Sequence, residues 1–216
     1  MRYVKGHGQQ TRSRIVEEAS YGLRQTGVDG MSVADLMKRV GLTHGGFYSH
    51  FESREALVIE AFASAMDRTV AHWLKFVNEL PVEERFDAFI GVYLKPGHRD
   101  DRARGCVLPA LGTDIARSSQ KARRAFARKL DEMIDVIADL LPGESPQQAR
   151  QIAISTLATM MGSIALARAV GDNKLSDEIL GAGHQALGGQ SARRRAPAAS
   201  AIRRPNKNRK ETNDHD

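Results

Sequence analysis

Apolar residues recur with helical spacing along most of the 216-residue chain. Near the N-terminus, Ile15, Ala19 and Leu23 would share one face of a helix over residues 11–26. Gly27 follows directly, and glycine is the residue that most often ends a helix. No segment alternates apolar and polar residues with the period of two that is typical of strands, and no internal repeat is found. The pattern therefore predicts an all-α protein.

Helix start signals divide the remainder of the chain into further helices. Ser32, Ser53 and Ser145 stand where a side-chain oxygen could accept a hydrogen bond from the first turn of a helix. Pro146 then occupies the first helical position, where a missing N–H costs least. The charged segment 96–105 is predicted to be a loop. The predicted helices are 11–26, 32–40, 43–50, 53–78, 82–94, 106–117, 119–141, 145–170 and 175–187.

These elements suggest two domains between two less ordered ends. Residues 1–10 are expected to be a flexible N-terminus, 11–52 a three-helix DNA-binding domain and 53–188 a larger helical domain. Residues 189–216 lack apolar periodicity and are rich in arginine, so a disordered basic tail is predicted there. That tail could contact DNA phosphates without sequence preference, or it could serve only to keep the protein soluble.

The stretch LTHGGFYSHF, residues 42–51, departs from the helical pattern. Gly45 and Gly46 are adjacent, and each would cost a helix interior about 1 kcal/mol relative to alanine. The stretch nevertheless follows the predicted helix 32–40 after a short turn, which is the arrangement of a helix-turn-helix unit. The second helix of that motif enters the major groove of DNA, and a glycine there lets the backbone approach the duplex closely.

The side chains of this stretch fit the same interpretation. Phe47 and Phe51 are four residues apart and would anchor the segment on its inner side. The polar residues that remain would face outward, and their hydroxyl and imidazole groups can donate to phosphates and base edges. They are Thr43, His44, Tyr48 and His50.

The charge distribution agrees with an anionic partner. The formal net charge is +6, and residues 1–50 carry seven Lys/Arg against four Asp/Glu. Residues 51–190 are nearly neutral, whereas residues 191–216 carry eight basic against three acidic side chains. Basic ends around a neutral middle favour nucleic acid as the partner, although solvation of both ends would give the same counts.

Composition and motifs argue against several other classes of protein. No run approaches the roughly 20 apolar residues that span a bilayer, and the N-terminus has no apolar signal segment. A single cysteine excludes an intrachain disulfide and fits the reducing cytoplasm. Phosphate-binding loops, nucleophile elbows and zinc-protease motifs are absent, so neither catalysis nor a cofactor is expected. His44 and His50 are six residues apart, whereas helical zinc pairs are four apart, so no metal is expected. Asp100 and Asp101 are interpreted as a solvated turn.

The sequence GLTHGGFYSHFESREAL resembles the DNA-binding signature of TetR/AcrR-type transcriptional repressors, and the resemblance is specific over about residues 11–60. It implies an all-helical homodimer that binds a palindromic operator in double-stranded DNA. It also implies a larger C-terminal domain that dimerises and binds a small-molecule inducer. Arg54 stands where the family usually has lysine, and arginine keeps the charge. The DNA contacts that the resemblance implies are Arg12, Ser32, Thr43, His44, Gly45, Tyr48, His50 and Arg54.

The predicted helix 145–170 carries many small side chains, which could form a close-packed dimer interface with the helix 175–187 or could pack inside a monomer. These residues, with two neighbouring methionines, are Ala153, Ser155, Ala158, Met160, Met161, Gly162, Ser163 and Ala165. A second set could line a ligand cavity or could be plain core. It comprises Phe62, Phe89, Tyr93, Phe126 and Met133.

Cys106 is a candidate sensor of oxidants or electrophiles. It is expected at the N-terminus of a helix, near Arg102 and Arg104, and both features favour the reactive thiolate. Its placement also resembles that of the single cysteine in a TetR branch that senses electrophiles. The alternative is a small buried hydrophobic residue.

The expected function is therefore a cytoplasmic repressor that leaves its operator when a ligand binds or Cys106 is modified. The alternative is a helical homodimer that binds a ligand or a protein and does not bind an operator.

Overall fold

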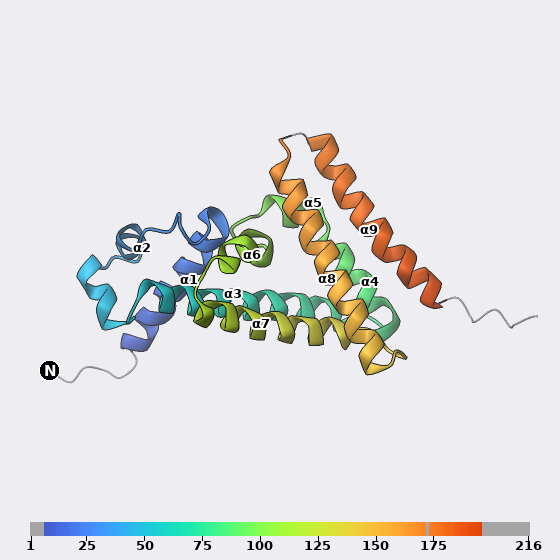
Figure 1. The fold of residues 1–216 in the computed structure, drawn as a ribbon, viewed down its shortest axis with the longest axis horizontal. Coiled ribbons are helices and arrows are strands. Elements are labelled where there is room, and N and C mark those ends of the chain that lie inside the picture. The colour runs from blue at the N-terminus through green and yellow to red at the C-terminus, as the bar shows by residue number, and fades with distance from the viewer. Residues whose placement is uncertain (1–6, 172, 196–216) are drawn as a thin grey trace, which may run out of the picture.

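The structure is a computed structural model that describes residues 7–171 and 173–195, with side chains up to residue 188. Those residues contain helices and no strand, which confirms the all-α prediction (Figure 1). The elements are α1 (His7–Thr26), α2 (Val33–Arg39), η1 (His44–Ser49), α3 (Arg54–Val77), α4 (Val82–Tyr93), α5 (Pro96–Asp100), α6 (Leu108–Ala116), α7 (Gln120–Ala138), α8 (Pro146–Ala169) and α9 (Asn173–Arg195).

The predicted helix caps are confirmed. The side chains of Ser32, Ser53 and Ser145 each accept a hydrogen bond from the backbone N–H three residues later. Ser119 caps α7 in the same way. These contacts satisfy N–H groups that have no partner inside the helix, which is why the starts were readable from sequence.

The structure corrects three boundaries. The predicted loop 96–105 begins with the short helix α5, because Pro96 occupies the first helical position and Lys95 has the extended backbone of a cap residue. α1 begins at His7, so part of the expected flexible N-terminus is helical. α9 continues to Arg195, so the first residues of the predicted tail 189–216 are helical as well. Residues 1–6 and 196–216 lie outside the described part of the chain.

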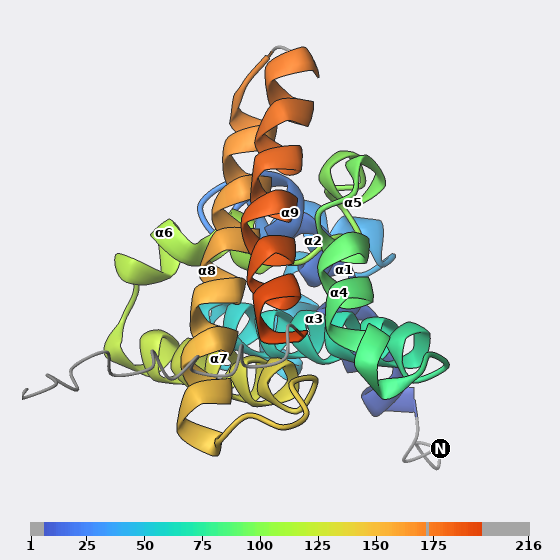
Figure 2. The ribbon, with the colours of Figure 1, turned by 90° about the vertical axis from the view of Figure 1, so that its right-hand side faces the viewer.

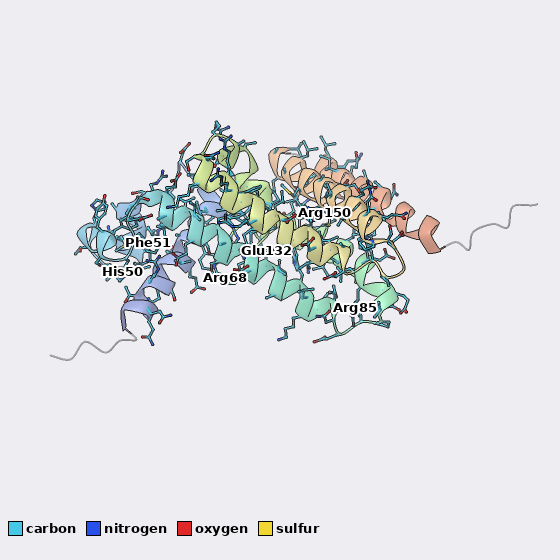
Figure 3. The ribbon with its side chains drawn as sticks, turned by 60° about the horizontal axis from the view of Figure 1, so that its bottom comes forward. His50, Phe51, Arg68, Arg85, Glu132 and Arg150 are labelled. Atoms are coloured by element: carbon cyan, nitrogen blue, oxygen red, sulfur yellow. The ribbon has the colours of Figure 1, made fainter. Side chains whose placement is uncertain are left out.

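The helices form a short N-terminal part joined to a longer bundle. In Figure 1, α1, α2 and η1 occupy one end of the molecule, and α3 leads from them into the bundle. α3 and α7 lie side by side, as Figure 3 shows. α7 in turn packs against α8, and α8 against α9, whose outer halves project from the body in Figure 2.

Helix α8 is the one described helix that is long and apolar enough to cross a membrane by length and composition. It packs between α7 and α9, and residues such as Ala153, Met160 and Ile164 are fully buried in the core. The helix is therefore a core element of the bundle.

Arg24 of α1 connects the two parts of the molecule. Its side chain is only 6% exposed. The guanidinium donates to the backbone carbonyls of Ser20 at 3.0 Å, Ala65 at 3.3 Å and Gly105 at 2.7 Å. These acceptors belong to α1, to α3 and to the segment before α6. One buried cation therefore holds three segments that are distant in sequence.

Asp114 of α6 makes a second connection to the end of α1. Its Oδ2 accepts a hydrogen bond of 2.9 Å from the backbone N–H of Val28. Gly27 has a positive φ of 73°, and a Cβ at this position would lie 2.7 Å from the same carboxylate oxygen. Glycine is required there both by its backbone conformation and by the close approach of α6.

We predict that Arg24→Met lowers the free energy of unfolding by about 3 kcal/mol, because it leaves buried carbonyls without their charged donor. Chemical denaturation followed by circular dichroism measures this change. Arg14→Met is the matched control on α1, since Arg14 is exposed and makes one hydrogen bond to the Val40 carbonyl. Equal losses in the two variants would contradict the connecting role of Arg24.

Candidate DNA-binding surface and the surroundings of Cys106

The segment predicted as the helix 43–50 is a short 3₁₀ helix, η1, which corrects the expectation of an α-helix. The Thr43 side chain caps it by accepting from the N–H of Gly46 at 3.3 Å. The His50 N–H donates to the Phe47 carbonyl at 2.9 Å, which is the i to i+3 pattern of a 3₁₀ helix. Six residues with two adjacent glycines propagate an α-helix poorly, so the tighter form is adopted.

The inner side of η1 is anchored as predicted. Phe47 and Phe51 are 1% and 2% exposed, and their rings stack with centroids 5.6 Å apart. Tyr48 contacts Phe47 edge to face while remaining 66% exposed. An aromatic ring fixed at one edge and open to solvent at the other is held in position for a partner.

The outer side of η1 presents most of the predicted DNA contacts. Thr43, His44, Gly45 and Tyr48 are all exposed, whereas His50 is half-buried. His44 and Tyr48 lie together, with ring centroids 6.1 Å apart. A Cβ built on Gly45 would meet nothing within 4 Å, so the fold itself does not require glycine at this position.

Arg12 is held by contacts within the protein, although its side chain is 39% exposed. Its guanidinium donates to both carboxylate oxygens of Glu60 on α3 and to the His50 carbonyl. It also lies 4.1 Å from the centre of the Phe51 ring, a cation–π contact. Figure 3 shows His50 and Phe51 together at this end of the molecule. These contacts give Arg12 a positioning role at the end of η1, and its phosphate contact stays a prediction.

Arg54, like Arg12, donates its guanidinium hydrogen bonds to groups of the protein itself. Its guanidinium donates to the backbone carbonyls of Val28 and Met31, in the loop between α1 and α2. These hydrogen bonds connect α3 to that loop, and the phosphate contact of Arg54 stays a prediction. Ser32 is exposed, and its oxygen accepts from the Asp35 N–H at 3.3 Å, which leaves its hydroxyl proton available to a partner.

Two sequence-family models match the chain. Residues 15–61 match the N-terminal region of bacterial regulatory proteins of the tetR family. Residues 81–178 match the C-terminal domain of LmrA/YxaF-like transcriptional regulators. The chain belongs to the TetR family. It is a DNA-binding transcriptional regulator with an N-terminal helix-turn-helix domain.

Relatives and solved structures of this family cover most of the chain. The HTH-type transcriptional regulator Rv0196 of Mycobacterium tuberculosis is 27% identical over 73% of this chain and 84% of its own length. The HTH-type transcriptional repressor DhaR of Mycobacterium sp. GP1 is 24% identical over 57% of this chain and 61% of its own. Their names describe regulators and indicate no enzymatic activity.

Among solved structures, a TetR transcriptional regulator of Chloroflexus aurantiacus superposes with a TM-score of 0.70 and 24% identity. The match covers 86% of this chain and 96% of the other. The reduced form of Escherichia coli NemR gives a TM-score of 0.70 at 18% identity, over 83% and 96% of the two chains. At these identities the likeness shows the fold alone.

The structure buries Cys106, and burial disfavours the expected reactive thiolate. Cys106 lies two residues before α6 begins and is 0% exposed. Burial raises the pKa of the Cys106 thiol, and this effect outweighs hydrogen bonding from Leu108 and Tyr93 and the charges of two arginines. Those arginines are Arg24 and Arg168, which are distant in sequence, and not the expected Arg102 and Arg104.

His98 holds the backbone beside Cys106, and sequence analysis did not single it out. Its Nε2 accepts from the Cys106 N–H at 2.8 Å, so Nδ1 carries the proton and donates to the Tyr93 carbonyl at 2.6 Å. Burial lowers the pKa of His98 to about 4. The neutral imidazole is therefore a fixed structural connector near neutral pH. The hydrogen bond between His98 and Cys106 joins residues that are eight apart, so no local sequence pattern indicated it.

The other predicted candidates take structural positions. Phe62, Phe89, Tyr93 and Met133 are buried in the core, and Phe126 stacks on Phe62 with ring centroids 5.2 Å apart. Asp100 pairs with Arg99 at 2.7 Å, and Arg99 also reaches Asp177 of α9. Within residues 7–171 and 173–195, no three His, Cys, Asp or Glu side chains are grouped to hold a metal ion.

We predict that iodoacetamide labels native Cys106 at least about a hundredfold more slowly than in the denatured chain, because the thiol is buried and reacts only after local opening. Mass spectrometry over time measures the rate. An exposed cysteine introduced by Ser49→Cys in a Cys106→Ser background is the control for reagent activity. Equally fast labelling of native and denatured Cys106 would restore the sensor hypothesis.

Proposed function

We propose that this regulator is a cytoplasmic homodimeric repressor that binds a palindromic operator through η1 and is released by a noncovalent small-molecule ligand. The observation that carries the DNA-binding role of η1 is its outer surface. Thr43, His44 and Tyr48 are exposed donors on a segment whose inner side is anchored in the core. Gly45 leaves open space between them, where a duplex backbone can approach.

The proposed contacts divide into two roles. Tyr48 and Thr43 supply hydroxyl groups for phosphates or base edges, and His44 supplies an imidazole next to Tyr48. Ser32, at the N-terminus of α2, adds a further hydroxyl. Arg12 and Arg54 act indirectly, since they orient the backbone around η1 by donating to carbonyl groups.

The dimer is proposed to form through α8 and α9. The small residues of α8 separate into two faces in the structure: Ala153 and Ser163 are buried, whereas Ser155 and Ala158 are exposed. The exposed face continues to Leu166, which is 59% exposed. A stripe of small and apolar side chains on an exposed helix face lets a second helix pack closely. We therefore propose that the buried small residues pack inside the monomer and that the exposed ones form the dimer interface.

The buried thiol favours a noncovalent ligand over modification of Cys106. A covalent inducer would first require the segment around Cys106 to open, because the thiol is 0% exposed and its pKa is raised by burial. A noncovalent ligand needs only a higher affinity for the DNA-free form than for the DNA-bound form.

We predict that Gly45→Ala and Tyr48→Ala each weaken operator binding by about tenfold, a loss of about 1.4 kcal/mol. The first places a methyl group between backbone and DNA, and the second removes a hydroxyl and a ring. A gel-shift titration on an operator recovered by random-sequence selection measures both.

Gly112→Ala is the matched control, because a Cβ at Gly112 of α6 also meets nothing within 4 Å. It should leave operator binding unchanged. Operator binding that is unchanged in all three variants would show that η1 does not read DNA. Failure to select any operator with the wild-type protein would favour the alternative of a dimer without operator binding.

We predict that Ala158→Arg raises the dimer dissociation constant by at least about tenfold, because a desolvated charge would sit in a close-packed interface. Sedimentation equilibrium measures the change. Ala127→Arg is the control, since Ala127 is an exposed alanine of α7 outside the proposed interface. If the two variants dimerise as well as the wild type, the proposed interface is wrong.

A further inference from the structure

A cavity of about 470 Å³ lies between α1, α3 and the segment 95–105. This volume falls within the range of small-molecule sites, about 300–1,000 Å³. The cavity uses neither the exposed face of α8 nor any residue of η1. Its lining comprises Tyr21, Arg24, Arg68, Thr69, His72, Trp73, Val92, Lys95, Gly97, His98, Asp101, Arg104 and Gly105.

The walls of this cavity suit an aromatic body. Rings from Tyr21, His72, Trp73 and His98 line it, together with the side chain of Val92. Trp73 and His98 are 6% and 8% exposed, and their rings meet edge to face with centroids 5.8 Å apart. These two buried rings form a preorganised surface. A planar ligand can pack against it without the entropy cost of ordering mobile side chains.

The same lining carries four cationic side chains against one carboxylate. The cations are Arg24, Arg68, Lys95 and Arg104, and the carboxylate is Asp101. Burial, followed by the nearby charge of Arg68, lowers the pKa of Arg24 below its usual range. Arginine stays charged over the whole physiological range, so the cavity keeps an excess of positive charge.

Three of these cations can accept an anionic partner. Lys95 has no hydrogen bond or ion pair from its ammonium group to any described residue, and it is exposed. Arg104 is 80% exposed and lies 3.7 Å from Asp101. Arg68 lies 3.7 Å from Glu17, and both side chains are about half exposed. Exposed pairs at such distances are weak, so either arginine can exchange its carboxylate partner for that of a ligand.

We propose that this cavity binds a small aromatic carboxylate, with its ring against Trp73 and its carboxylate between Arg68 and Lys95. The inference deepens the proposed function, on which it rests, because it names the chemical class of the releasing ligand and its position between the two domains.

The position of Arg68 explains how such a ligand affects DNA binding. Arg68 is on α3, between the N-terminal end of this helix, near His50 and Phe51, and its other end, near Arg85 (Figure 3). Its guanidinium donates to the hydroxyl of Ser20 on α1. A carboxylate that recruits Arg68 competes with this contact between α1 and α3. The ligand thereby changes how α1, the first helix of the DNA-binding domain, packs against α3.

Trp73 allows binding to be measured directly, because it is the one tryptophan in the sequence. The full-length protein without DNA is titrated with 4-tert-butylbenzoate, with the neutral 4-tert-butylbenzamide and with acetate, and tryptophan fluorescence is recorded. The benzoate should produce a saturable change with an affinity at least about tenfold higher than that of either control, since only it combines ring and charge.

Lys95→Gln and Arg68→Gln should each weaken benzoate binding by about tenfold. Arg128→Gln is the matched control, because Arg128 is an exposed cation of α7 outside the cavity and should leave the affinity unchanged. Lys95 is exposed, and its ammonium group makes no hydrogen bond or ion pair with a described residue, so Lys95→Gln decides the question if Arg68→Gln fails to fold.

The proposal is overturned if the benzoate gives no saturable change up to about 10 mM, if the amide binds equally well, or if Lys95→Gln binds like the wild type. Gel-shift experiments on the selected operator are made separately. Operator binding without benzoate binding overturns this site and leaves the repressor function intact. Benzoate binding without operator binding supports the site and contradicts the repressor function.

Discussion

The buried guanidinium of Arg24 is the contact on which the arrangement of the two domains depends. It joins carbonyls of α1, α3 and the segment before α6 within one set of hydrogen bonds. Taking a cation out of water is costly unless each donor is satisfied, so this set holds together or fails as a unit. The hydrogen bond from Val28 to Asp114 adds a second fixed point at the end of α1. Through α1, the larger domain therefore sets the orientation of η1.

Under the proposed function, this arrangement provides a physical route between ligand and DNA. The cavity around Trp73 is bounded by Arg24 and Arg68, which both contact Ser20 of α1. A ligand that binds there does not need to act over a long chain of residues, because it contacts the connecting groups themselves. The size of its effect is set by how differently it binds the two orientations of α1. The exposed pair of Lys121 and Glu52, 3.1 Å apart, is a weaker third link between α7 and the residues after η1.

Local features of this protein could be predicted from the sequence, because capping and helical periodicity act within a few residues. The serine caps, the all-α class and the anchoring pair Phe47 and Phe51 were predicted in this way and are present. The form of η1 was predicted wrongly, because periodicity does not distinguish a short 3₁₀ helix from one turn and a half of α-helix. α5 was missed because its five residues, PGHRD, give no row of apolar side chains with helical spacing.

Roles that depend on distant contacts could not be predicted. Arg12 and Arg54 lie where the family resemblance implies phosphate contacts, yet Glu60 and backbone carbonyls bind their guanidinium groups. Cys106 follows basic residues in the sequence, but the fold places it in a core beside Tyr93 and His98, where burial outweighs the nearby charges. These partners lie on other elements: α3 for Arg12, the loop between α1 and α2 for Arg54, and α5 for Cys106.

The distance between the two copies of η1 in the dimer tests the coupling most directly. A spin label on Ser49→Cys, in a Cys106→Ser background, reports this distance by pulsed electron paramagnetic resonance. We expect one narrow distance distribution in the operator complex. In the free form of the proposed dimer, we expect the distribution to become broader when Asp114→Ala removes the hydrogen bond to Val28. An identical distribution with and without Asp114→Ala, in a dimer of unchanged stability, would contradict the claim that the larger domain positions η1.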